Sequence, residues 1–166
     1  YKVPTRGLIG FRNSFLTLTR GEGIMSTYFS GWIPYEGSIE ARASGSMISM
    51  SQGKTTPYAL FGIQPRGTLF VAEGVEVYEG MIIGEHSRDN DIDVNVCREK
   101  KLTNVRTAGK DENVILTPPR KMSLEQCMDF IDMDELMEVT PASIRMRKRV
   151  LQANMRPKKK KVDAAQ

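Results

Sequence analysis

The residues best suited to chemistry in this chain are basic, and five of them gather in one polar stretch, REKKLTNVRTAGKDE, at residues 98–112. Lysine and arginine bind phosphate oxygens, and the interspersed Thr103 and Asn104 can hydrogen-bond phosphate, sugar or base edges. The basic residues are Arg98, Lys100, Lys101, Arg106 and Lys110, and the acids Glu99, Asp111 and Glu112 lie toward the ends. A loop of about 15 residues inside a compact domain is usually functional or disordered. The pattern favours a polyanion as partner, and a merely solvated loop is the alternative.

A second basic stretch strengthens the case for a nucleic acid. Residues 145–161 contain nine basic residues and no acid. The two stretches together hold 14 of the 24 lysines and arginines, although the net charge of the chain is only +4. Clustering of this kind is typical of nucleic-acid binding. The first part of the second stretch is predicted to be a second anchor for the polyanion, and it comprises Arg145, Arg147, Lys148 and Arg149.

The sequence shows no pattern typical of catalysis, of zinc binding or of nucleotide binding. The only histidine, His86, lies among turn-forming residues and is predicted to be a surface or turn residue rather than a ligand or catalytic base. Cys97 and Cys127 form no CxxC pair, so free thiols are expected rather than a zinc site. Residues 53–55 resemble the end of a Walker A loop, but Ile48 stands where that loop requires its first glycine. We therefore expect no catalytic residues and no cofactor in this chain. No apolar run approaches the ~20 residues that a bilayer requires, so no membrane partner is expected.

The first 36 residues are predicted to contain one helix and one strand. Residues 5–19 carry an apolar stripe at helical spacing, and residues 23–32 are rich in β-favouring types. Gly21 is expected to end the helix. One helix and one strand cannot form a domain, so these residues are interpreted as the end of a larger unit. Pro34 and Gly37 mark its boundary.

Residues 37–152 are predicted to form a β-rich, barrel-like domain with short helices and one long basic loop. Short apolar runs separated by glycines and charged turns are typical of strands in such a core. They lie at residues 47–50, 68–71, 81–83, 92–96, 114–116 and 142–151. Helices are expected at residues 58–64, after Pro57, and at residues 123–131, where Ser123 and Gln126 form a capping box. Residues 153–166 are interpreted as a basic, disordered tail.

Six acids lie within or just after the second of these helices: Glu125, Asp129, Asp132, Asp134, Glu135 and Glu138. Carboxylates repel phosphates, so these residues are predicted to form a solvent-exposed face that points away from the polyanion. Two alternatives remain open. The acids could bind a metal ion, or they could face a basic protein.

Several motifs resemble a known family. The stretch PTRGLIGFRNSFLTLTRGEGIMSTYFSGW is similar to the last helix and strand of domain V in translational GTPases such as elongation factor G. The motifs VYEGMIIGEHSRDNDIDVNVC, KKLTNVR and EVTPASIRMRKR resemble the C-terminal domain of the BipA/TypA family. The resemblance runs from Tyr1 to about Arg149. It implies an α+β chain in which the C-terminal piece of a ferredoxin-like domain V precedes the β-rich domain.

The resemblance also implies a function. It indicates the ribosome-binding C-terminal module of a GTPase that takes part in large-subunit assembly and in stress or cold adaptation. GTP and Mg²⁺ would bind to a GTPase domain upstream of Tyr1, so this part is expected to be no enzyme. The family's long loop matches residues 100–112. It implies contacts with large-subunit rRNA near the A site and with the acceptor arm of tRNA.

Ten residues are therefore predicted to contact RNA, and they are Lys100, Lys101, Thr103, Asn104, Arg106, Lys110, Arg145, Arg147, Lys148 and Arg149. A cytoplasmic, ribosome-associated location without a small-molecule substrate is expected. The alternative is a protein-interaction or regulatory domain that contacts a ribosomal protein or the GTPase domain.

Overall fold

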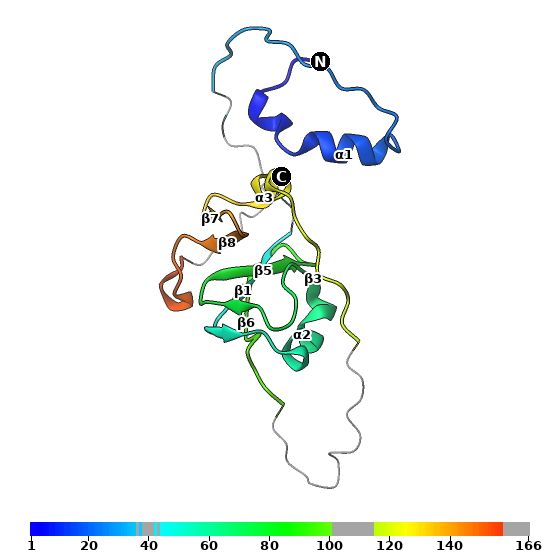
Figure 1. Ribbon diagram of the computed structural model, residues 1–166. Coiled ribbons are helices and arrows are strands. Elements are labelled where there is room, and N and C mark those ends of the chain that lie inside the picture. The colour runs from blue at the N-terminus through cyan, green and yellow to red at the C-terminus, as the bar shows by residue number, and fades with distance from the viewer. Residues whose placement is uncertain (36, 38–41, 43, 101–114, 158–166) are drawn as a thin grey trace, which may run out of the picture.

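The computed structural model describes residues 1–35, 37, 42, 44–100 and 115–157 of the 166-residue chain. The N-terminal helices lie at one end, and a mixed body of helices and sheet occupies the rest (Figure 1). The helices are α1 (Phe11–Leu18), α2 (Pro57–Ile63) and α3 (Leu124–Phe130), with short 3-10 helices at Thr5–Leu8, Gln64–Arg66 and Ala153–Met155. The strands are β1 (Ser46–Ser49), β2 (Gly53–Lys54), β3 (Gly67–Leu69), β4 (Glu76–Val77), β5 (Met81–His86), β6 (Ile92–Val94), β7 (Glu135–Val139) and β8 (Ile144–Lys148).

The N-terminal segment departs from its prediction in two places. A single helix over residues 5–19 is wrong, because Gly10 adopts a left-handed conformation (φ 76°) that separates the 3-10 helix from α1. A strand at residues 23–32 is also wrong. A β-favouring stretch becomes a strand only when a neighbour pairs with its backbone. Residues 23–32 pair with no described strand, and the aromatic side chains of Tyr28, Phe29 and Trp32 are exposed.

The body is built on a six-stranded sheet in the order β6-β1-β5-β8-β7, and β3 also pairs with β5. The β1–β6 pair is parallel and the others are antiparallel. Strands β2 and β4 form a separate two-stranded ladder. The α+β class is confirmed. Because the pairings of the described strands leave β6 and β7 as open edges, the barrel-like closure stays unconfirmed.

Each face of the sheet is covered by one helix. Along β5, Met81 and Ile83 point into the cluster that buries α2, whereas Ile82 points into the cluster that buries α3. This alternation is the two-residue period of a strand with two buried faces. Both helices follow their predicted signals: Thr56 caps α2 ahead of Pro57, and Ser123 forms the capping box of α3.

Two polar residues of the body are more buried than the sequence predicted. His86 ends β5 and is only 6% exposed, so its predicted surface position is wrong. Its Nδ1 lies 2.6 Å from the carbonyl oxygen of Asn90, which can only accept, so the hydrogen is on Nδ1. Glu135 begins β7 and is 3% exposed, so the acids of this region do not all face solvent.

Candidate nucleic-acid interface

The described residues on either side of 101–114, within and after the basic stretch predicted to bind RNA, contact the ends of α2. Five of its predicted contact residues lie outside the described residues: Lys101, Thr103, Asn104, Arg106 and Lys110. Before them, the Thr56 hydroxyl donates to the carbonyl oxygen of Arg98 at 2.6 Å. After them, the Gln64 amide accepts a hydrogen bond from the backbone N–H of Thr117 at 3.1 Å and donates to the Ile115 carbonyl at 3.4 Å. Thr56 and Gln64 cap the two ends of α2, so the helix holds both points of attachment about 12 Å apart.

The described residues around α2 carry excess positive charge. Residues 56–66, 97–100 and 115–119, which we call the α2 end, contain three basic residues and one acid: Arg66, Arg98 and Lys100 against Glu99. All four side chains are exposed. The neighbouring β2–β4 ladder pairs Lys54 with Glu76, so these two residues together add no net charge to the surface. The position of Lys100 is therefore compatible with the predicted phosphate contact.

The second predicted anchor is split by the alternation of β8. Arg145 is exposed, while Met146 and Lys148 are buried on the opposite side of the strand. Arg147 is half-buried and forms an ion pair with Glu138. Glu138 also accepts a hydrogen bond from the Tyr78 hydroxyl at 2.8 Å. Burial, followed by this hydrogen bond to the Glu138 carboxylate, raises the pKa of Tyr78 to about 12.

Among the predicted contact residues that the structure describes, Lys148 is the one whose position contradicts the prediction. Its side chain is 1% exposed, and its Nζ lies 2.7 Å from Asp91, 3.0 Å from Asp134 and 2.8 Å from Glu135. An ammonium group with three carboxylate partners in a buried site has no position left for a phosphate. Burial alone would lower the pKa of Lys148, but hydrogen bonds to the carboxylates raise it above its ordinary value.

Arg42 completes this buried ionic cluster from outside the sheet. Its guanidinium donates to both carboxylate oxygens of Glu135, at 2.7 and 2.9 Å, and lies 4.2 Å from the centre of the Phe130 ring. It also donates to the Ser46 hydroxyl at 2.6 Å. Burial raises the pKa of Glu135, but the bonds from Arg42 and Lys148 outweigh it and hold the pKa below its ordinary value. Sequence reasoning missed Arg42, because a single arginine among small residues carries no local signal.

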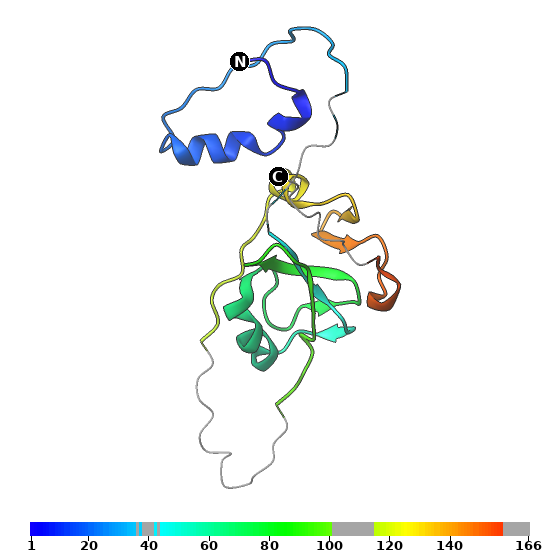
Figure 2. The same ribbon diagram turned by 180° about the vertical axis from the view of Figure 1, so that it is seen from behind.

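The described residues of the two predicted anchors lie apart. The chain enters residues 97–100 from β6, and β8 is separated from β6 by β1 and β5. Three strand spacings amount to about 14 Å. Both views of the ribbon place α2 and α3 at opposite ends of the sheet, with β7 and β8 near α3 (Figures 1 and 2). Arg145 is exposed opposite Glu138 of β7, and Arg149 is exposed with its backbone N–H donating to the carbonyl oxygen of Asp134. The α2 end is therefore the better candidate interface.

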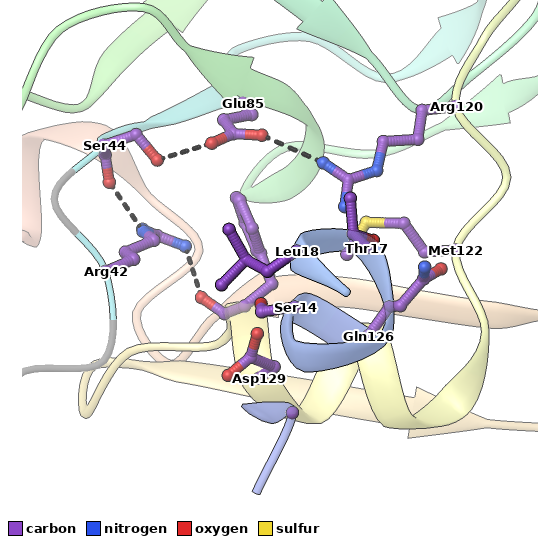
Figure 3. Close-up of a pocket in the computed structure, with 12 residues that line it drawn as sticks. Ser14, Thr17, Leu18, Arg42, Ser44, Glu85, Arg120, Met122, Gln126 and Asp129 are labelled. Atoms are coloured by element: carbon purple, nitrogen blue, oxygen red, sulfur yellow. Dashed lines mark hydrogen bonds and ion pairs between the residues drawn. The ribbon is translucent and has the colours of Figure 1, made fainter. Parts of the chain in front are cut away.

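A cleft of about 500 Å³ lies between α1 and the body (Figure 3). Arg120, which lines it, lies 3.3 Å from Glu85, which also accepts a hydrogen bond from the Ser44 hydroxyl at 2.7 Å. On the α1 side, Gly10 approaches α3 so closely that a Cβ atom would lie 2.1 Å from Cγ of Asp129. The cleft is thus a junction between α1 and the body.

The described residues hold neither a metal-binding cluster nor a membrane-spanning helix. Within them, no three histidine, cysteine or acidic side chains are grouped so that they could hold a metal ion. No helix in the same part of the chain is long and apolar enough to cross a membrane.

Comparison with known proteins agrees with this two-part architecture. Residues 1–43 match the family model "Elongation factor G C-terminus", a domain with a ferredoxin-like fold. Residues 44–153 match the family model "TypA/BipA C-terminal domain". The chain belongs to the TypA/BipA family. The two matches meet between residues 43 and 44, and the boundary predicted after residue 36 stays a prediction.

Curated relatives support the same assignment. The protein "Large ribosomal subunit assembly factor BipA" of Salmonella typhimurium is 56% identical over 157 residues, which are 94% of this chain and 26% of that protein. The protein of the same name from Bacillus subtilis is 49% identical over 159 residues, 95% of this chain and 26% of its own length. The chain thus spans about a quarter of the length of these relatives.

Proposed function

We propose that this chain is the ribosome-binding module of a TypA/BipA translational GTPase and contacts RNA through its α2 end. Its relatives are named as assembly factors of the large ribosomal subunit. The observation that carries the proposal is the attachment of the basic stretch to both ends of α2, on a surface with net positive charge. RNA is a polyanion, so a positively charged surface of this kind attracts it and positions the module.

The module would act by binding and not by chemistry. Phosphate contacts from five basic residues would fix its orientation: Arg98, Lys100, Lys101, Arg106 and Lys110. Thr103 and Asn104 would add contacts to sugars or base edges. The RNA would be large-subunit rRNA near the A site and the acceptor arm of tRNA. In the second anchor, Arg145 and Arg149 would add peripheral contacts to RNA. Arg147 already forms an ion pair with Glu138, and Lys148 belongs to the buried ionic cluster.

The activity of the whole protein is part of the same proposal. GTP and Mg²⁺ would bind to a GTPase domain outside this chain, and the module itself would hydrolyse no nucleotide. The whole protein would act in the cytoplasm on the ribosome, in large-subunit assembly and in adaptation to stress or cold.

A protein-interaction or regulatory role is the second candidate. It is favoured by the acids on and after α3, where Glu125 and Asp129 are exposed beside Met128 and Met133. Such a surface would suit a basic ribosomal protein or the parent GTPase domain.

Sedimentation of the chain with large ribosomal subunits at increasing salt distinguishes the two candidates. With about five phosphates neutralised, the slope of log affinity against log salt should be about −4. The triple variant Lys100→Ala, Lys101→Ala, Arg106→Ala should lose most of its binding and flatten this slope. The matched control, Glu125→Gln with Asp129→Asn, should bind like the unaltered chain. Binding that survives RNase treatment and depends on Glu125 and Asp129 would refute the RNA proposal.

A further inference from the structure

The outer face of α2 carries two exposed aromatic side chains. Tyr58 and Phe61 stand three residues apart, so they lie on the same side of the helix. They are 43% and 49% exposed. The opposite side of α2 is buried in the core, so the fold does not require an aromatic residue at either position. The other three aromatic residues between 44 and 157 are half-buried or buried: Phe70, Tyr78 and Phe130.

Basic residues lie near both ends of the helix that carries this aromatic pair. The hydrogen bond from Thr56 holds the Arg98 backbone beside the start of α2, and Arg66 follows the end of the helix. Residues 56–66 contain no acid, and Glu99 is the only acid among the described residues of the α2 end. A docking site for an uncharged apolar partner would not need this rim, whereas a phosphate backbone matches its charge.

From this arrangement we infer that Tyr58 and Phe61 form a stacking surface for unpaired nucleotides of RNA. Aromatic side chains bordered by cations are the usual means by which proteins hold single-stranded RNA. Every base has a flat apolar face, so stacking tolerates many sequences, while the neighbouring cations bind the phosphates. The inference rests on the proposed function and adds a class of ligand to it: bases that lie outside a double helix.

The two kinds of contact make different predictions for single-stranded and double-helical RNA. In a duplex the bases are stacked on one another and their faces are not available to a protein. Phosphates, in contrast, are present in both forms. Loss of the aromatic pair should therefore weaken binding of single strands and leave duplex binding unchanged.

The test measures fluorescence anisotropy of a labelled single-stranded RNA of about 12 nucleotides and of a duplex of equal length. The double variant Tyr58→Ala, Phe61→Ala should bind the single strand at least about tenfold more weakly. Its affinity for the duplex and its salt slope should be unchanged. The variant Tyr58→Trp, Phe61→Trp keeps two flat aromatic rings and should bind the single strand as the unaltered chain does. Both positions are exposed, so an unchanged urea midpoint confirms that each variant is folded.

Two results would overturn the stacking surface. One is an unchanged affinity of the double alanine variant for the single strand, and the other is an equal loss for both RNAs. The double alanine variant could instead keep its RNA affinity and no longer bind ribosomal proteins that are free of RNA. That result would assign the outer face of α2 to a protein partner and would also overturn the stacking surface. If the proposed RNA-binding function itself were wrong, the result would be distinguishable. The unaltered chain would then bind neither the single strand nor the duplex with a salt-dependent affinity.

Discussion

Replacing Lys148 with methionine tests whether this residue belongs to the core or to an RNA-binding surface. Methionine keeps most of the length of the aliphatic stem and removes the ammonium group. The change would leave Arg42 as a partner of Asp91 and Glu135, and it would remove the ammonium partner of Asp134. The Glu135 side chain is fully buried, so its charge cannot be compensated by water.

The expected loss follows from the geometry of the cluster. At an effective dielectric constant of 20, two unit charges about 3 Å apart attract by roughly 5 kcal/mol, and desolvation offsets much of this. Removing one partner of a buried ion pair usually costs about 3–5 kcal/mol. Asp91 and Asp134 are 21% and 44% exposed, so water can compensate part of their charge. We therefore expect the lower end of that range, about 3 kcal/mol in the free energy of unfolding.

Urea unfolding followed by circular dichroism at pH 7 measures this loss. With an m-value of about 1.5 kcal/mol per molar urea, the midpoint should fall by about 2 M. The matched control is Arg145→Met on the exposed side of the same strand, which should change stability by less than about 0.5 kcal/mol. A loss below about 1 kcal/mol for Lys148→Met, or an equal loss for Arg145→Met, would refute the reasoning.

Three further predictions concern Glu135 of the buried ionic cluster, Gly10 beside α3, and Thr56 at the start of α2. The pKa of Glu135 is lowered on folding, so its stabilisation is complete above its ordinary value of 4.5 and is lost as the pH falls through the folded value. Glu135→Gln should accordingly be less stable at pH 7 and lose less stability than the unaltered chain between pH 4.5 and pH 2, measured by urea unfolding. Gly10→Ala should perturb the NMR signals of Asp129, because the added Cβ atom would meet the Asp129 side chain. The control is Gly21→Ala, where φ is a similar 84° and a Cβ atom would have no neighbour within 4 Å, so the Asp129 signals should be unchanged. Thr56→Ala removes the cap of α2 and the hydrogen bond to Arg98, so we expect a loss of about 1–2 kcal/mol in thermal or urea unfolding.

The sequence predicted those elements whose signals are local. The position of Pro57 and the capping box of Ser123 fix the starts of α2 and α3, and both helices begin where expected. Short apolar runs likewise located β1, β5 and β6. The family resemblance is confirmed, because its motifs are long and occur in a fixed order.

Features that depend on distant residues could not be predicted. Lys148 and Arg145 look alike in sequence, and only the face of β8 on which each lies separates a core residue from an exposed one. Glu135 was expected to face solvent, because its main partner Arg42 lies 93 residues away in sequence. Residues 23–32 have the composition of a strand, but strand formation also requires a partner, which composition cannot supply.

Site-specific photocrosslinking to large ribosomal subunits tests the central claim most directly. The crosslinking residue would replace Ile115 at the α2 end in one variant and Met133, between α3 and β7, in another. Both side chains are apolar and similarly exposed, at 79% and 83%, so neither replacement should disturb the core. We expect crosslinks to rRNA from position 115 and few or none from position 133. Crosslinks to rRNA from position 133 alone, or to proteins alone from position 115, would contradict the claim that the α2 end faces RNA.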